Sequence, residues 1–295
     1  MQQKIGLVFS GGGARGAYQI GVWKALKEVG LDNKISAVSG TSVGALNGAA
    51  FCQNDFELAV KLWLELRKLK VLTPDPKILL RHIGSAIFAK GGITGKFISL
   101  GRSIYDHGLF SRRGIEKIID EHLDTTLIRN SKVPLYICTL NTSKTKLNFV
   151  KLNRKSKNSI RSYLLASSAI PALFRREKIG SHYHLDGGLL PMMRNNTPFE
   201  TLIDKEKCNV IINVFLKAKP DLKPQAKYPG VKFCNIYPAK NSGGILPSLN
   251  FSKENVRQLI DDGFRDTLRK LKKEWGGRGD LNPRPLGPQP SALTN

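Results

Sequence analysis

Acidic residues are scarce in this chain. Only 23 of its 295 residues are aspartate or glutamate, against 47 lysines and arginines, so the formal net charge is +24 at pH 7. Such an imbalance favours anionic partners, either nucleic acid or an anionic membrane surface. Aromatic residues make up 8% of the sequence and do not interleave with the basic runs, and no nucleic-acid-binding motif is present. We therefore expect no nucleic-acid partner.

Long apolar runs are also missing. No segment reaches the roughly 18 apolar residues that a membrane-spanning helix needs. At the N-terminus, Met1-Gln2-Gln3-Lys4 leads straight into a strand-like run, without the pattern of a secretory signal. These absences predict a cytoplasmic protein, peripheral on the inner membrane face at most.

Cysteine is limited to Cys52, Cys138, Cys208 and Cys234, and no pair has C-x-x-C spacing. Scattered cysteines of this kind are typical of reduced structural thiols rather than of a disulfide framework. No cluster of histidine and cysteine has the spacing of metal ligands. We expect neither a metal nor another cofactor.

Short apolar runs alternate with helix-like segments. The runs predicted as strands are Ile5–Phe9, Ile35–Val38, Leu135–Leu140, Leu147–Leu152 and Val210–Leu216. The predicted helices between them are Ala17–Val29 and Ala45–Phe51. Alternation of this kind favours an α/β layered sheet with its site at the carboxyl ends of the strands.

One strand-to-helix junction carries a serine between glycines, Gly40-Thr41-Ser42-Val43-Gly44. The spacing G-x-S-x-G is typical of a nucleophile elbow, in which a sharp turn exposes the serine hydroxyl. The N-terminus of the following helix would face the reacting centre, where negative charge develops. An ordinary turn remains the alternative for this pentapeptide alone.

A glycine-rich turn follows the first strand and precedes the first helix. Backbone N–H groups in such a turn, beside a helix N-terminus, bind anions. A P-loop is excluded because Arg15-Gly16-Ala17 stands where Gly-Lys-Ser/Thr is required. A dinucleotide site and an oxyanion hole both stay open; for the first, Asp32 is the acidic residue at about the right distance, although it precedes the second strand. The turn reads Gly11-Gly12-Gly13-Ala14-Arg15-Gly16.

An aspartate further along the chain, in Asp186-Gly187-Gly188, is a candidate base for Ser42, whose hydroxyl needs a proton acceptor. No histidine follows Asp186, so the order serine, acid, histidine of a conventional α/β-hydrolase cannot be completed with it. A triad would need an earlier acid, Asp120 or Asp124, together with His182 or His184.

With these motifs in order, the sequence resembles the patatin-like phospholipase family. The oxyanion motif is matched by 11–16, the nucleophile motif by 40–44 and the aspartate motif by 186–188; a further block is matched by 166–174, Ala-Ser-Ser-Ala-Ile-Pro-Ala-Leu-Phe. The resemblance covers about residues 5 to 216. It implies a three-layer α/β/α sandwich with a mainly parallel central sheet and a Ser42–Asp186 dyad, acting as a serine acyl hydrolase on phospholipids or other acyl lipids.

The predicted catalytic domain spans 1–275, with a motif-bearing core at about 5–216 and a C-terminal helix at about 252–275; a disordered tail is predicted for 276–295. Three other functions stay open. An acyltransferase would use the same dyad, and a non-catalytic module would bind either nucleotide and other anions or membranes. With lipid as the substrate, the basic surface indicates peripheral contact with anionic membrane.

The segment from Leu72 to Phe110 is predicted to contain a short amphipathic helix at 78–88. Its apolar residues alternate with Lys77, Arg81 and Lys90 before the turn at Gly91-Gly92. Packing of this helix on the core is the favoured interpretation. A lid or an interfacial segment over an acyl pocket is the alternative.

Overall fold

The computed structural model describes residues 3–66, 73–188, 194–240 and 246–275. Within these ranges, eight strands form one sheet in the order β10-β9-β1-β2-β5-β8-β7, with β6 paired to β5. The strands are β1 (Ile5–Phe9), β2 (Ile35–Thr41), β5 (Leu135–Asn141), β6 (Lys146–Lys151), β7 (Glu177–Ile179), β8 (His182–Asp186), β9 (Val210–Val214) and β10 (Lys232–Ile236). The five strands from β10 to β5 are parallel, and β6, β7 and β8 are antiparallel to their neighbours.

The carboxyl ends of β2 and β8 meet beside β5. Because β6 occupies one side of β5 from Tyr136 to Asn141, β2 and β8 share its other side. There Thr41, the last residue of β2, pairs with Cys138, and Asp186, the last residue of β8, pairs with Thr139. Because β8 is antiparallel to β5, whereas β2 is parallel to it, their carboxyl ends converge. This topology brings two segments about 145 residues apart together.

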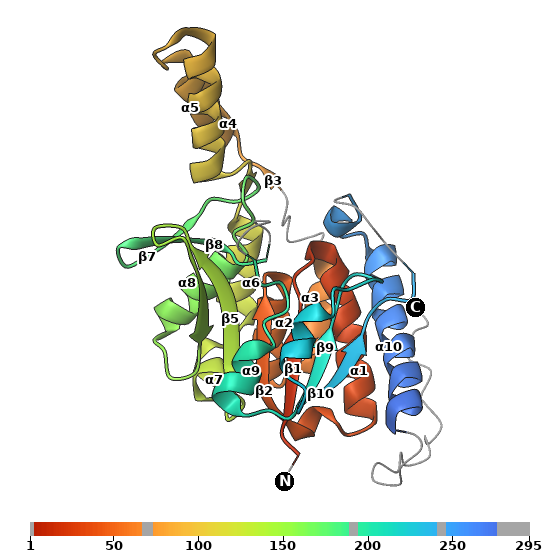
Figure 1. Ribbon diagram of the computed structural model, residues 1–295. Helices are drawn as coiled ribbons and strands as arrows, with labels where there is room; N and C mark the ends of the chain where they lie inside the picture. The colour runs from red at the N-terminus through yellow and green to blue at the C-terminus, as the bar shows by residue number, and fades with distance from the viewer. Residues whose placement is uncertain (1–2, 67–72, 189–193, 241–245, 276–295) are drawn as a thin grey trace.

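Helices cover both faces of the sheet, which confirms the predicted three-layer α/β/α architecture (Figure 1). The larger layer packs on Leu7, Phe9, Ile212 and other buried apolar side chains of one face. The thinner layer, around α9, packs on Val8, Ala37, Ile211 and their neighbours. The helices of the body are α1 (Ala17–Glu28), α2 (Val43–Gln53), α3 (Phe56–Glu65), α6 (Arg113–His122), α7 (Thr125–Asn130), α8 (Lys157–Ser167), α9 (Glu200–Glu206) and α10 (Lys253–Trp275).

The C-terminal helix α10 begins where the sequence predicted, after Ser252, whose hydroxyl accepts the Asn255 N–H at 3.3 Å. It lies alongside α1 (Figure 1). The two backbones approach so closely that a Cβ on Gly21 would sit 1.9 Å from Ile260 O, and one on Gly263 would sit 2.1 Å from Tyr18 O. Glycine is therefore required on both helices. The predicted tail 276–295 lies outside the described residues.

Helices α4 (Pro76–Ile87) and α5 (Gly92–His107) form an antiparallel hairpin that projects from the body (Figure 1). A two-stranded ribbon, β3 (Thr73–Pro74) with β4 (Phe110–Ser111), closes its base. The favoured prediction that helix 78–88 packs on the core is wrong, because most of its apolar side chains are exposed: Leu80 is 68% and Phe88 86% exposed. No helix of the described part of the chain is long and apolar enough to cross a membrane.

Candidate active site

Ser42 occupies the turn between β2 and α2, as the G-x-S-x-G spacing predicted. Its backbone has φ 58° and ψ −127°, a conformation that L-residues rarely adopt. The turn is tight enough that a Cβ on Gly44 would lie 2.1 Å from Phe9 O, and one on Gly40 2.3 Å from Gly44 O. Any side chain at these two positions would force the turn open, so the glycines are required for the elbow.

A buried serine that the sequence reasoning gave no role fixes this turn. Ser42 N–H donates to Ser167 Oγ at 3.0 Å, and the Ser167 hydroxyl donates to Cys138 O at 2.9 Å. Ser167 therefore links the elbow to β5, the strand that also pairs with β8. It lies in the 166–174 block, whose match to the family is the signal that would have found it.

Asp186 ends β8 and is fully buried. Its Oδ1 accepts the Gly188 N–H at 2.8 Å, whereas Oδ2 makes no hydrogen bond of regular geometry with any described residue. Burial raises the pKa of this carboxyl to about 6, against the smaller lowering effects of the Ser42 hydroxyl and the Gly188 N–H. A carboxylate with a pKa near the working pH, next to a serine, can accept the proton of that serine.

The glycine-rich turn lies against the same elbow. Gly11 lies beside Ser42 Cβ, and Gly13, at φ 58°, begins the 3-10 turn that leads into α1. Within the described ranges, the N–H groups of Gly12 and Gly13 have no hydrogen-bond acceptor. Gly11 N–H, in contrast, donates to Asn196 O at 3.2 Å, so it is not available as an oxyanion donor.

The remaining residues of the turn have structural contacts. Ala14 is fully buried, and Gly16 lies against Val43 and Trp63. Arg15 Nε–H donates to Gly12 O at 3.4 Å, across the turn.

Two adjacent asparagines that the sequence reasoning missed connect the three motifs. Asn195 N–H donates to Gly187 O at 2.8 Å, and Asn195 O accepts the Thr41 hydroxyl at 2.9 Å. Asn196 Nδ2 donates to Gly11 O at 3.1 Å, and its side chain lies against Gly188. The only sequence signal was their position a few residues after the aspartate motif.

Buried polar side chains of α1 and α2 form a second set of hydrogen bonds that supports the glycine-rich turn. Gln19 Nε2 donates to Ser10 O at 2.6 Å, and Asn47 Nδ2 donates to Gly16 O at 3.0 Å and to Gln19 Oε1 at 2.7 Å. Trp63 Nε1 completes the set by donating to Asn47 Oδ1 at 2.9 Å. These bonds hold both ends of the turn while its middle peptide groups stay free of them.

An apolar pocket opens beside Ser42 and Gly13, with a cavity volume of about 100 Å³. Helices α2, α3 and α6 and the segment after α8 supply its walls. The apolar side chains that line it are Val43, Leu46, Ala50, Ala59, Leu62, Trp63, Leu66, Ile115, Ile118, Leu123, Ile170, Leu173, Phe174, Leu249 and Phe251. A pocket of this composition suits a hydrocarbon chain.

Among the described residues, neither candidate acid of the alternative triads is paired with a histidine. Asp120 forms an ion pair with Arg161 at 2.6 Å. Asp124 accepts hydrogen bonds from the N–H groups of Thr126 and Leu127 at the start of α7. The dinucleotide interpretation also fails geometrically. Asp32 precedes β2, whereas the glycine-rich turn follows the neighbouring parallel strand β1, so the two lie at opposite ends of the strands.

Known proteins match this chain in sequence and in fold. The family model for patatin-like phospholipase matches residues 7–203. The neuropathy target esterase sws of Drosophila melanogaster is 27% identical over 208 residues, which is 70% of this chain and 12% of that protein. The lysophospholipase nte1 of Aspergillus terreus is 50% identical over 52 residues, 18% of this chain and 3% of that protein.

This chain therefore spans only a small part of the length of these relatives. Among solved structures, VipD from Legionella pneumophila superposes with a TM-score of 0.51 at 16% identity, covering 92% of this chain and 67% of VipD. That likeness concerns the fold. The family model matches well over half of the chain, and the chain belongs to the patatin-like phospholipase family, a family of lipid acyl hydrolases.

Proposed function

We propose that this chain is a serine acyl hydrolase that cleaves the carboxylic esters of phospholipids or other acyl lipids. The observation that carries the proposal is the position of Ser42, in an elbow beside the buried Asp186 and at the opening of an apolar pocket. The family membership and the names of the relatives support the same chemistry.

In the proposed first half-reaction, Ser42 Oγ attacks the ester carbonyl while Asp186 accepts the hydroxyl proton. The tetrahedral oxyanion takes hydrogen bonds from Gly12 N–H and Gly13 N–H, each such donor contributing about 3–4 kcal/mol to the transition state. Asp186 then returns the proton to the leaving alcohol. The acyl chain lies in the apolar pocket throughout.

In the second half-reaction, Asp186 takes a proton from water as the water oxygen attacks the acyl-enzyme carbonyl. The same two N–H groups hold the second oxyanion. Its collapse breaks the bond to Ser42 Oγ, which regains its proton from Asp186, and the fatty acid is released.

A fluorophosphonate with a long alkyl chain tests this assignment, because it reacts only with an activated serine and mimics the acyl lipid. We expect one adduct, on the peptide that carries Ser42, together with loss of fatty-acid release from lysophospholipid. Peptide mass spectrometry locates the adduct. An adduct on another serine, or turnover that survives complete labelling, would contradict the proposed nucleophile.

We further propose that the α4–α5 hairpin attaches the protein to an anionic lipid surface. It projects from the end of the molecule at which β1 and β2 terminate, the end that carries Ser42 (Figure 1). Its exposed apolar side chains include Leu80, Ile87, Phe88, Ile93 and Phe97. From 76 to 107 the hairpin has five lysines and arginines against a single acid, Asp106. Apolar side chains among cations are typical of segments that enter the interface of an anionic bilayer.

Replacing Leu80, Phe88 and Phe97 together with serine is expected to weaken binding to phosphatidylglycerol-containing vesicles at least about tenfold. Burial of each such side chain in the bilayer contributes roughly 1.5–3 kcal/mol. Vesicle co-sedimentation measures the binding. Hydrolysis of a short, soluble ester should stay unchanged, since the hairpin lies outside the apolar pocket.

The matched control is Leu127→Ser, which removes a 50%-exposed leucine from α7 in the body. Equal vesicle binding by the triple variant and this control would rule out the hairpin as the attachment site.

A further inference from the structure

A second, polar cavity of about 720 Å³ lies at the foot of the hairpin, outside the apolar pocket. It is bounded by α4, the end of α5, the start of α6 and the strand β7. Seven lysine and arginine side chains line it, against four carboxylates. We call it the basic cavity.

All four carboxylates of the basic cavity already have partners. Glu177 pairs with Arg112 at 2.9 Å, Glu116 with Arg175 at 3.3 Å, and Asp106 with Arg176 at 2.8 Å. The fourth, Asp75, accepts the Lys77 N–H at 2.9 Å as the N-cap of α4.

Four exposed cations of this lining have no carboxylate partner within the described residues. They are Lys77, Arg81, Arg113 and Lys178. They leave the cavity with an excess of positive charge.

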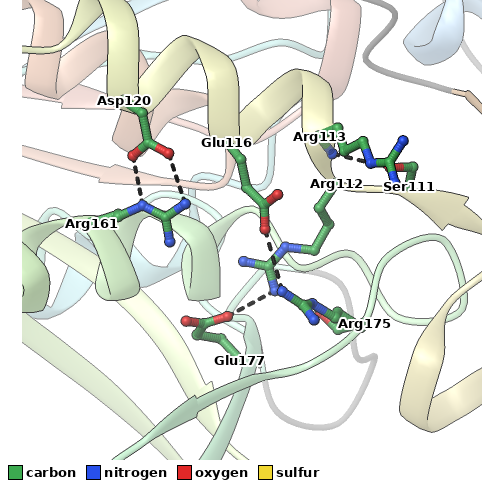
Figure 2. A network of polar contacts seen from close by, with 8 residues as sticks. All are labelled: Ser111, Arg112, Arg113, Glu116, Asp120, Arg161, Arg175 and Glu177. Atoms are coloured by element: carbon green, nitrogen blue, oxygen red, sulfur yellow. Dashed lines mark hydrogen bonds and ion pairs between the residues drawn. The ribbon is translucent and has the colours of Figure 1, made fainter.

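Arg112 also lines the basic cavity, with only 3% of its side chain exposed. Figure 2 shows its guanidinium between Glu177 and Arg175. Nη1 donates to Glu177 Oε2 at 2.9 Å and to Arg175 O at 3.2 Å. Nη2 is buried and has no acceptor among the described residues. A buried donor without an acceptor is costly, so the Arg112 guanidinium is held here at an energetic cost.

The surroundings of the neighbouring His107 reflect this positive potential. Burial lowers the pKa of His107, and Arg81 and Arg176 lower it further, against an opposing effect of Asp106. An anion bound in the cavity would offset the repulsion from these two arginines.

We propose that the basic cavity binds a phosphoryl group. Guanidinium groups match the oxygens of a phosphate in paired hydrogen bonds, and a tetrahedral anion can engage several of them at once. The phosphoryl group belongs either to a lipid headgroup, brought to the cavity when the hairpin meets a bilayer, or to a soluble phosphate ester. The site is distinct from Ser42, and its occupation does not require turnover.

Isothermal titration with inorganic phosphate tests the site directly. Arg81→Gln combined with Arg113→Gln removes two exposed cations without touching the buried Arg112–Glu177 pair, so the variant should fold. We expect its dissociation constant for phosphate to rise at least about tenfold relative to wild type. Arg129→Gln combined with Arg257→Gln is the matched control, since it removes the same charge from exposed positions on α7 and α10.

Vesicle co-sedimentation identifies the source of the phosphoryl group. All proteins carry Ser42→Ala, so that the lipid stays intact, and vesicles of phosphatidylcholine are compared with vesicles that also contain phosphatidic acid. Weaker binding of R81Q/R113Q to the phosphatidic acid vesicles alone indicates a lipid headgroup. Equal vesicle binding with weakened phosphate binding indicates a soluble phosphate ester.

The proposal is overturned if R81Q/R113Q binds inorganic phosphate as tightly as wild type or as the R129Q/R257Q control, or if wild type binds none. Neither readout depends on ester hydrolysis, so failure of this site and failure of the proposed hydrolase are distinguishable.

Discussion

Replacing Ser42 with alanine is expected to reduce ester hydrolysis by about 10⁶-fold, as loss of the nucleophile does in a well-studied serine hydrolase. No described neighbour can substitute for it. Ser168, the C-cap of α8, also lines the apolar pocket, but its hydroxyl donates to Leu164 O at 2.6 Å in the last turn of that helix, and it is not hydrogen-bonded to Asp186. Initial rates on a lysophospholipid and on a short soluble ester should fall together.

The fold should survive this substitution. The elbow is held through Ser42 N–H and Ser167, which alanine retains, and the strained backbone conformation is as costly for alanine as for serine. We expect the unfolding free energy to stay within about 0.5 kcal/mol of wild type. Ser159→Ala, in the first turn of α8, is the control for loss of a serine hydroxyl. A Ser42→Ala protein with wild-type rates would refute the mechanism.

Replacing Asp186 with asparagine is expected to lower kcat by about 10⁴-fold, because the amide cannot accept the proton of Ser42. Wild type should also lose activity as the pH falls through about 6, where the carboxyl of Asp186 takes up a proton. The pH profile of the residual Asp186→Asn activity should lack this step. A rate profile measured from pH 5 to 9 on a neutral ester checks both statements.

The same substitution should stabilise the protein. The pKa of the Asp186 carboxyl rises from 3.8 to about 6 on folding, so below pH 3.8 it is neutral in both states. Between pH 3.8 and about 6 the unfolded carboxyl ionises while the folded one stays protonated, so stability falls over this window; above it the folded protein holds a buried charge and stability stays at the lower level. Asparagine carries no charge, so Asp186→Asn should gain on the order of 3 kcal/mol over wild type at pH 8 and little near pH 4.

Urea denaturation of both proteins at pH 4.5 and pH 8 measures the difference. An inactive variant that is more stable at pH 8 means that the buried carboxylate is retained for chemistry rather than for the fold. An Asp186→Asn protein that is both active and less stable would show that Asp186 acts as a structural residue.

The alternation of strands and helices and the site motifs could be predicted because each depends on local chemistry. Buried parallel strands need continuous apolar runs, and the elbow needs glycine on both sides of Ser42. Even so, β2 continues through Ser39 and Gly40 to Thr41, three residues beyond the predicted end. Small polar residues do not have the apolar pattern that predicts a strand. Here they continue β2 because they are buried between β1 and β5.

Long-range features could not be predicted. The meeting of β2 and β8 depends on β6 occupying one side of β5, which no local pattern encodes. Asn195 and Asn196 act through hydrogen bonds to residues between 8 and 185 positions away. The hairpin was misplaced because an amphipathic helix has the same sequence pattern whether its apolar side packs on a core or on a lipid surface.

Elements that follow the family match complete the sheet and one of its helical layers. The family model ends at 203, yet β9, β10 and α10 all follow that residue. Cutting the chain there would leave β1 without β9, an open hydrogen-bonding edge in the middle of the present sheet, and would strip Gly21 of the helix it contacts. An exposed central strand invites aggregation. The segment that matches the family model therefore lacks two strands of this sheet and the helix that packs on α1.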